Sequence, residues 1–144
     1  MNKVRILLLS ISLISHGSAF ADYASILKQA KHGDAEAQYA IGTMFQLGKG
    51  VQEDDKAAFK WTRLSASQGN AKAQNNLGYM YDMGEGVDQN DMLAYMWKYL
   101  AADQGELDAV EHRDQLTRQM TKQQLEEAQK KANACKAKKY KDCH

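Results

Sequence analysis

The residues best suited to chemistry in this 144-residue chain are two cysteines close to its C-terminus. Cys135 and Cys143 can form a disulfide in an oxidising compartment, or they can bind a metal ion as thiolates. With His144 they offer only three ligands, whereas a structural zinc site is usually closed by four. We therefore expect a disulfide between Cys135 and Cys143, with the three-ligand metal site as the alternative, and we expect no metal and no other cofactor.

Catalytic constellations are hard to find in this chain. Nucleophilic catalysis needs a nucleophile, a base and an orienting group in contact. His32 stands at an expected helix end, where the helix dipole explains a positive charge, and the serines stand in no catalytic motif. Glu126 and Glu127 are adjacent in sequence, so they point in different directions around a helix. We predict no catalytic residues and expect a protein that is not an enzyme.

Two glycine-rich segments, GKGV at residues 48–51 and GEGV at residues 84–87, superficially resemble phosphate-binding loops. A phosphate loop needs a preceding strand and a following G-K-[ST] or a third glycine that opens a helix. The acidic residues after the second segment lack the ligand spacing of a calcium loop. The duplication of the segment favours a turn that recurs for structural reasons.

Both glycine loops belong to an internal repeat of 36 residues. Residues 33–68 align without a gap on residues 69–104, and 15 of the 36 positions are identical. Residues 23–32 and the stretch from Gly105 keep the same phase, so partial units flank the two full ones. Self-similarity at such a period is typical of stacked helical arrays.

Each unit is predicted to contain two helices. Apolar residues recur three or four positions apart, which places them on one helical face. These residues are Ala37, Ile41, Met44 and Leu47, then Ala73, Leu77, Met80 and Met83, in the first helices, and Ala57, Trp61 and Leu64, then Leu93, Trp97 and Leu100, in the second. Asp54 or Asp55 and Asn90 or Asp91 are expected N-caps of the second helices.

Gly42 and Gly78 stand inside the predicted first helices. An interior glycine costs a helix about 1 kcal/mol relative to alanine. Because this cost recurs at the same phase, we expect the partner helix to approach closely where no Cβ stands. The loop glycines are expected to take positive φ and turn the chain between antiparallel helices.

The shared pattern reads A-x-A-Q, a helical glycine, G-x-G-V, tryptophan and A-x-Q-G. In these residues the chain resembles the Sel1-like repeat family, relatives of the tetratricopeptide repeats, over about Ala35–Glu106. The resemblance implies an all-α fold, a right-handed α-solenoid of helix-turn-helix repeats with a concave groove, and a protein-binding function. The groove positions that it implies are Tyr39, Thr43, Gln46, Asn75, Tyr79 and Asp82, with Glu111 and Gln115 as a continuation, and the partner would be a protein or peptide.

A second function is suggested by cysteine-rich relatives of this family, some of which have been linked with penicillin binding and weak β-lactamase activity. A weak hydrolase of β-lactam or cell-wall compounds is therefore the alternative to a binding scaffold. Those relatives carry a disulfide in each repeat, which this chain lacks, and no S-x-x-K motif is present.

The chain departs from the repeat at Asp114, which stands where Gly42 and Gly78 stand in the full units, and no G-x-G-V loop follows. Thr121 and Gln124 form the pattern of a capping box, and a closing helix is expected over Met120–Ala137. Residues 121–144 are thus predicted to be a capping helix and a disulfide-closed tail, with Tyr140 near the bridge. Residues 122–144 contain seven lysines and three acidic residues, so the tail is either a solvated helix face or a peripheral contact with an acidic envelope surface.

The first 21 residues have the organisation of a secretory signal. Lys3 and Arg5 precede an apolar run over Ile6–Ile14, and Ala19-Phe20-Ala21 fits a small-x-small cleavage site. The apolar run is shorter than the roughly 20 residues needed to span a bilayer. We predict a signal peptide over residues 1–21, cleavage after Ala21, a repeat region over residues 22–120, and a location in the periplasm or outside the cell, where no nucleic-acid partner is expected.

Overall fold

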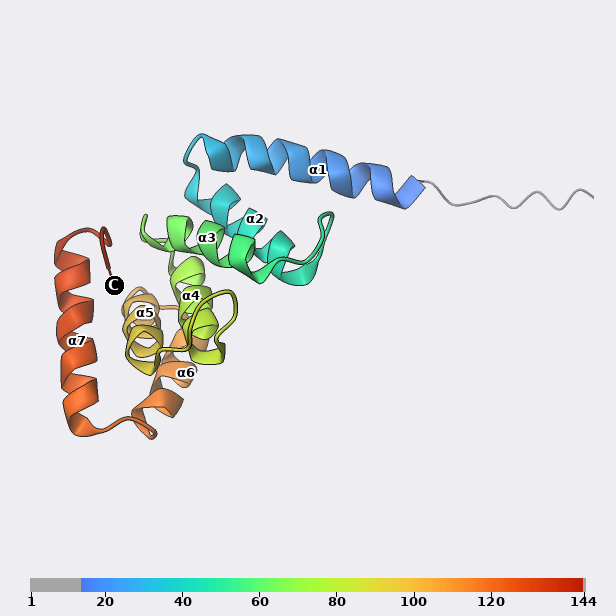
Figure 1. Ribbon diagram of the computed structural model, residues 1–144. Coiled ribbons are helices and arrows are strands. Elements are labelled where there is room, and N and C mark those ends of the chain that lie inside the picture. Colours follow the sequence, from blue (N-terminus) through green and yellow to red (C-terminus); the bar gives the residue numbers. More distant parts are fainter. Residues whose placement is uncertain (1–13, 144) are drawn as a thin grey trace, which may run out of the picture.

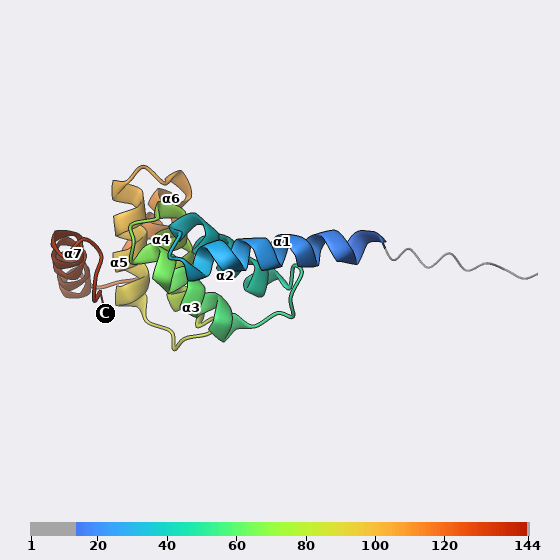
Figure 2. The same cartoon turned by 90° about the horizontal axis from the view of Figure 1, so that it is seen from above.

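The computed structural model describes residues 14–143, and these fold into seven helices without a strand. The helices are α1 (Ile14–Lys31), α2 (Ala35–Leu47), α3 (Asp55–Ala66), α4 (Ala71–Met83), α5 (Asp91–Asp103), α6 (Leu107–Thr117) and α7 (Lys122–Ala137). Successive helices from α1 to α6 pack on one another, and α7 packs on α5. Figures 1 and 2 show α1 and α7 at opposite ends of the stack. The predicted all-α solenoid is confirmed.

Residues 1–13 of the predicted signal peptide lie outside the described residues. Helix α1 starts at Ile14 and runs without a break through Ala21, the residue before the predicted cleavage site. Within residues 14–143, no helix combines the length and the apolar character that crossing a membrane requires.

The ends of the repeat helices are set by local side-chain chemistry. The side-chain oxygen of each N-cap accepts a hydrogen bond from the backbone N–H three residues on, as this cap chemistry requires. Gly48 and Gly84, with φ of 61° and 71°, close α2 and α4 in the left-handed conformation. The N-caps are Asp34, Asp54, Asn70 and Asn90. Asp54 and Asn90 were predicted, whereas Asp34 and Asn70 were missed.

The helical glycines lie where two helices cross closely. A Cβ on Gly42 would stand 3.2 Å from the backbone oxygen of Ala58 and 3.1 Å from the backbone nitrogen of Thr62. A Cβ on Gly78 would stand 3.0 Å from the oxygen of Ala94. The prediction that these glycines allow a close approach is confirmed.

Hydrogen bonds from the buried glutamines Gln38 and Gln74 and the exposed glutamines Gln68 and Gln104 join successive repeats. The Gln38 side chain donates to the oxygen of Ala30 at 3.1 Å, and Gln74 repeats this bond to Ala66 at 3.2 Å. Gln68 donates to Oε1 of Gln38 at 2.7 Å, as Gln104 does to Gln74. Because burying an amide without a partner is costly, these bonds explain why both glutamines recur at the same phase.

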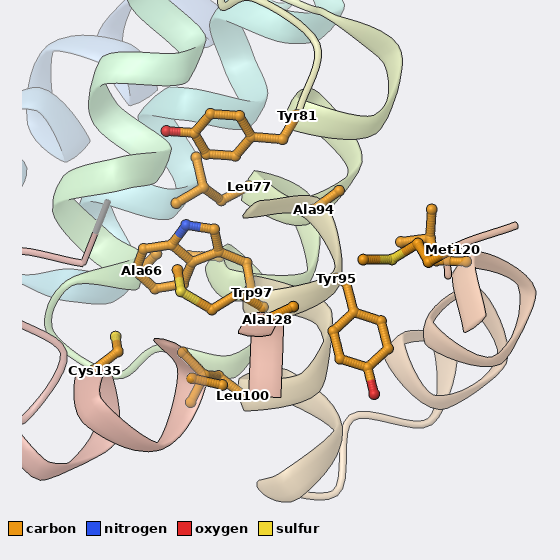
Figure 3. Packing of buried hydrophobic residues seen from close by; sticks show 14 residues of the cluster. Ala66, Leu77, Tyr81, Ala94, Tyr95, Trp97, Leu100, Met120, Ala128 and Cys135 are labelled. Carbon is orange, nitrogen blue, oxygen red and sulfur yellow. The ribbon is translucent and has the colours of Figure 1, made fainter. Parts of the chain in front are cut away.

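The core is more extensive at the second repeat than at the first. Trp97 and Leu100 are each only 1% exposed and lie in one apolar cluster with Ala128, Ala132 and Cys135 of α7. Figure 3 shows Trp97 and Leu100 beside Ala128 and Cys135. The corresponding Trp61 of the first repeat is only partly buried, and Leu64 is exposed. Helix α7 packs mainly on α5, so the same residue types are buried to different depths in the two repeats.

For three residues of the predicted apolar faces, the prediction of a buried side chain is therefore wrong. Leu64 is 42% exposed, and Leu47 and Met83 are 66% and 58% exposed. Leu47 and Met83 are the last residues of α2 and α4, directly before the glycine turn. The core side chains of these helices lie at earlier positions, such as Ile41 and Leu77, which are fully buried.

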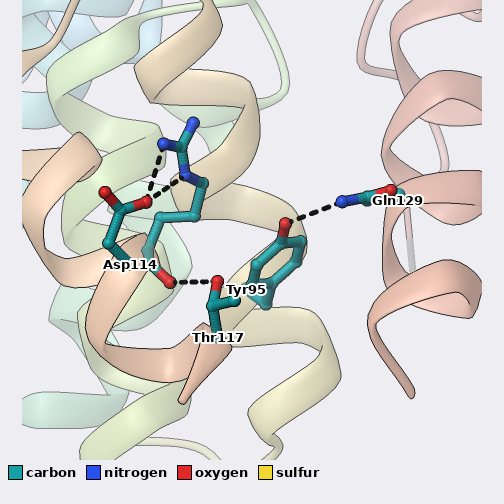
Figure 4. Close-up of polar contacts among 5 residues, drawn as sticks. Tyr95, Asp114, Thr117 and Gln129 are labelled. Atoms are coloured by element: carbon teal, nitrogen blue, oxygen red, sulfur yellow. Dashed lines mark hydrogen bonds and ion pairs between the residues drawn. The ribbon is translucent and has the colours of Figure 1, made fainter. Parts of the chain in front are cut away.

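Helix α7 closes the stack, and two polar contacts join it to α5. Its N-terminus has the predicted capping box of Thr121 and Gln124. In the middle, Nε2 of Gln129 donates to the hydroxyl of Tyr95 on α5 at 3.1 Å (Figure 4). The Lys136 ammonium pairs with the Asp103 carboxylate near the end of α5.

The tail after α7 folds back onto the stack. Cys135 and Cys143 are joined by a disulfide, with their Cα atoms 5.2 Å apart. The Tyr140 ring packs against the main apolar cluster and lies directly over Gly69, where a Cβ would be 2.9 Å from the ring. The bridge thus holds an aromatic side chain on the turn between α3 and α4.

Candidate binding pocket

A pocket of about 310 Å³ opens where the first helices of successive repeats meet. Helix α4 forms its main wall, because residues three or four positions apart lie on one side of a helix. Helix α2 contributes Tyr39, α5 contributes Lys98, and the start of α6 forms the opposite rim. The lining residues are Tyr39, Lys72, Asn75, Asn76, Tyr79, Lys98, Glu106, Asp108 and His112.

The structure brings together three of the six predicted groove residues. Tyr39, Asn75 and Tyr79 line this pocket. Thr43 lines a separate hollow of about 600 Å³ between α1 and α2. Its hydroxyl donates a hydrogen bond to the backbone carbonyl oxygen of Tyr39, one turn earlier in α2, at 3.0 Å.

The other two predicted residues, Gln46 and Asp82, are not among the residues that line the pocket. Gln46 accepts a hydrogen bond from Asn76 at 3.0 Å and donates one to Glu85 at 3.0 Å, so its amide holds α2 to α4 and to the following loop. Of the third-unit residues, Glu111 and Gln115 are exposed and absent from the lining, whereas His112 takes part in it.

Lys98 is the unexpected residue of the pocket. It is only 1% exposed, yet in the described part of the chain its ammonium makes no ion pair and no hydrogen bond. The ammonium lies 6.0 Å from the centre of the Tyr79 ring, within reach of a cation–π interaction. Burial lowers the pKa of Lys98 below its ordinary value, and the nearby Asp82 carboxylate partly opposes this effect.

Gly78 explains how a lysine can be buried at this position. A Cβ on Gly78 would stand 2.7 Å from Cγ of Lys98. The glycine therefore leaves room for the aliphatic stem of the lysine between α4 and α5. Thr62 occupies the same position in the first repeat, opposite Gly42.

Asn75 supplies an acceptor that has no partner. Its Oδ1 atom is buried, and no hydrogen bond reaches it within the described residues. The neighbouring Asn76 is different, because its amide donates to Gln46. A buried acceptor without a donor costs about 1–3 kcal/mol, so this amide is a group to which a ligand could supply the missing donor.

The pKa of the Tyr79 phenol is also affected by a nearby charge. The Glu85 carboxylate is the main cause of a raised pKa for Tyr79, followed by burial. The phenol thus keeps its proton and can act as a hydrogen-bond donor or acceptor at the pocket wall.

Sequence reasoning missed Lys98, although a signal for it was present. The 36-residue register places Lys98 at the position of Thr62, on the face that crosses the helical glycine. A lysine in that register must be buried beside the groove. A charged residue that occupies a packing position in only one of the two repeats indicates a candidate binding site there.

The pocket lining offers amide, phenol, ammonium, imidazole and carboxylate groups. No serine, threonine or cysteine is among its lining residues. Over the described residues, no group of three or more histidine, cysteine or acidic side chains is arranged to hold a metal ion. His144, part of the alternative metal site, lies outside the described residues, and both cysteines are used in the disulfide.

Helix pairs that stack with a 36-residue repeat define a helical-repeat protein of the α-solenoid type. A family model described as Sel1 repeat matches residues 35–70 and 71–106. The chain therefore belongs to the Sel1 repeat family, whose members are commonly scaffolds for protein–protein interaction.

Solved structures share this fold, including two that are also similar to the chain in sequence. The chain is similar to c5321, a protective antigen present in uropathogenic Escherichia coli strains that displays an SLR fold, with 31% identity and a TM-score of 0.77 over 81% of this chain and 25% of that one. It is also similar to a Sel1 repeat protein from Oxalobacter formigenes, with 33% identity and a TM-score of 0.64 over 66% of this chain and 39% of that one. The chain thus spans between a quarter and two fifths of the length of these proteins. No curated protein sequence matched it.

Proposed function

We propose that this chain is an exported adaptor that binds a peptide or an extended segment of a protein in the pocket formed by α2, α4, α5 and α6. The pocket lining carries the proposal, because Tyr39 and Tyr79 lie in one hollow with the unpartnered acceptor of Asn75. Tyrosines offer apolar rings with polar tips, and an extended backbone offers N–H donors. A peptide could satisfy both kinds of group at once.

The family supports a protein partner, since Sel1 repeat proteins generally bind other proteins. The size of the hollow fits this proposal. About 310 Å³ is enough for one or two side chains of a longer ligand. The rest of that ligand would lie along the open surface of α2, α4 and α6.

The exported location rests on the pattern of residues 1–21 and on the disulfide, because disulfides persist mainly in oxidising compartments. Cleavage after Ala21 would leave residues 22–31 of α1, which include the buried Ala30. N-terminal sequencing of the protein from the envelope or culture medium tests this part. An uncleaved chain found in the cytoplasmic fraction would contradict it.

The binding role is tested by crosslinking and capture from an envelope extract. The cleaved protein is compared with a Tyr39→Ala/Tyr79→Ala variant and with a control, Tyr99→Ala. Tyr99 is a partly buried tyrosine of α5 that does not line the pocket. A partner that is lost only from the pocket variant supports the proposal. A partner retained by all three proteins would place the contact elsewhere, for example on the lysine-rich face of α7.

A further inference from the structure

Lys98 and Asn75 are two unmatched polar groups in one pocket. Lys98 is 1% exposed and has no carboxylate within ion-pair distance in the described chain. The buried Oδ1 of Asn75 accepts no hydrogen bond from any described residue. A buried charge and a buried amide are normally paired within a protein. Their coincidence at one hollow therefore points to partners supplied from outside.

These two positions are among those that differ between the repeats. Lys98 corresponds to Thr62 and Asn75 to Tyr39, whereas the glycine inside the first helix of each repeat, where the second helix crosses, is unchanged. The shared residues maintain the packing of the stack. A lysine and an asparagine occupy these positions in the second repeat alone, so the packing of a repeat does not require them.

The two groups require different chemical groups from a ligand. The ammonium of Lys98 needs an anion, while Oδ1 of Asn75 needs a donor such as an N–H. The last residue of a peptide carries a carboxylate and its own backbone N–H, separated by a single carbon atom. One such residue could satisfy both groups, and its side chain would lie against Tyr39 or Tyr79.

The charges on the rim favour a singly charged ligand. Lys72 lines the pocket together with Glu106 and Asp108, so with Lys98 the lining carries two ammonium and two carboxylate groups. The two carboxylates would repel a phosphate dianion, which also brings no N–H. A carboxylate delivers one negative charge to one ammonium, and charge-assisted bonds of this kind are among the stronger hydrogen bonds.

We propose that this pocket recognises the free C-terminal carboxylate of a peptide, with Lys98 pairing with the carboxylate and Oδ1 of Asn75 accepting the N–H of the last residue. This inference rests on the proposed peptide-binding function and narrows its ligand class. An acidic side chain within a peptide is a second source of the same carboxylate chemistry, and the test must separate the two.

The test uses small probes and nuclear magnetic resonance of the isotope-labelled full chain. N-acetylalanine carries both the carboxylate and the N–H, N-acetylalaninamide lacks the carboxylate, and propionate lacks the N–H. N-acetylaspartic acid α-amide represents an acidic side chain within a peptide. Shifts of the Asn75 side-chain amide and of the α4 and α5 backbone report binding at the pocket.

We expect N-acetylalanine to bind at least about tenfold more tightly than its amide, since a hydrogen bond to a charged group typically carries that much affinity. Lys98→Thr should remove this preference, and it restores the residue found at the equivalent position, so the fold should tolerate it. Asn75→Leu should bring the affinity of N-acetylalanine down towards that of propionate. Lys60→Met, at an exposed lysine of α3 that does not line the pocket, is the control and should change affinity by less than about twofold.

Three results would overturn the inference. The first is equal binding of N-acetylalanine and its amide, the second is tighter binding of the aspartate probe, and the third is no binding of N-acetylalanine at all. A pool of short random peptides, prepared with free and with amidated C-termini, separates this failure from that of the proposed function. If both pools bind and Tyr39→Ala/Tyr79→Ala abolishes both, peptide binding stands and the carboxylate preference falls.

Discussion

Replacing Gly42 by alanine tests the close crossing of α2 and α3. In an unobstructed helix this change stabilises the fold by about 1 kcal/mol, because alanine has the higher helix propensity. Here the new Cβ would lie 2.5 Å from Oγ1 of Thr62, 3.1 Å from its backbone nitrogen and 3.2 Å from the oxygen of Ala58. A change of rotamer can relieve the first contact. The other two are with the backbone of α3, so the helices themselves must move apart.

Overpacking of this kind typically costs about 1–3 kcal/mol. Set against the gain in propensity, the net change for Gly42→Ala should be a destabilisation of about 1 kcal/mol. Urea unfolding followed by far-ultraviolet circular dichroism measures the free energy of unfolding. The informative quantity is the sign of the change, which is opposite to the one that propensity alone predicts.

Lys60, an exposed residue of α3, provides the matched control. The difference between Lys60→Ala and Lys60→Gly measures propensity without packing, and it should favour alanine by about 1 kcal/mol. Adding Thr62→Ala to the Gly42→Ala variant should recover only part of the loss, because the backbone contacts remain. If Gly42→Ala stabilises the protein as much as alanine does at residue 60, the argument from close packing is refuted.

Three further changes test other parts of the structure. Among residues 14–143 the buried hydroxyl of Thr62 has no hydrogen-bond partner, so Thr62→Val should stabilise the chain by about 1 kcal/mol in urea unfolding; a loss of stability would contradict this. Cys135→Ser/Cys143→Ser opens a short loop and should cost about 2–3 kcal/mol, which thermal unfolding beside the reduced wild type measures; an unchanged midpoint would contradict this. Burial lowers the pKa of Lys98 below 10.5, so between the two pKa values the unfolded chain binds more protons and stability rises with pH. The unfolding midpoint of the wild type relative to Lys98→Thr should therefore increase from neutral pH towards 10.5; a flat difference would contradict the burial of a charge.

The helices and their ends were predictable because they depend on short-range chemistry. N-caps such as Asp54 and Asn90 act on the backbone three residues away, and the capping box of Thr121 and Gln124 spans the same distance. Gly42 could be placed at a helix crossing because its cost is local and recurs at a fixed period. The groove was predicted only in part, with Tyr39, Asn75 and Tyr79 in one pocket and Gln46 used to join two helices.

Burial depended on what lies on the far side of each helix. Leu64 and Leu100 stand at the same phase of the repeat, yet the first is 42% exposed and the second 1%. The difference comes from α7, which packs on α5 and has no equivalent over α3. A periodic pattern describes one helix face at a time and carries no information about this neighbour.

The sequence by itself determined the repeat, the helix pairs, the turns and the family. Each of these depends on residues that are at most 36 positions apart in the chain. Tertiary structure decided which faces are covered and which polar groups are left unmatched. Lys98 is the clearest case, because its position in the repeat could be read from the sequence, whereas its lack of a partner depends on the side chains that four helices bring to one pocket. Local propensity and capping act along the chain, while burial and pairing arise only when distant segments meet in space.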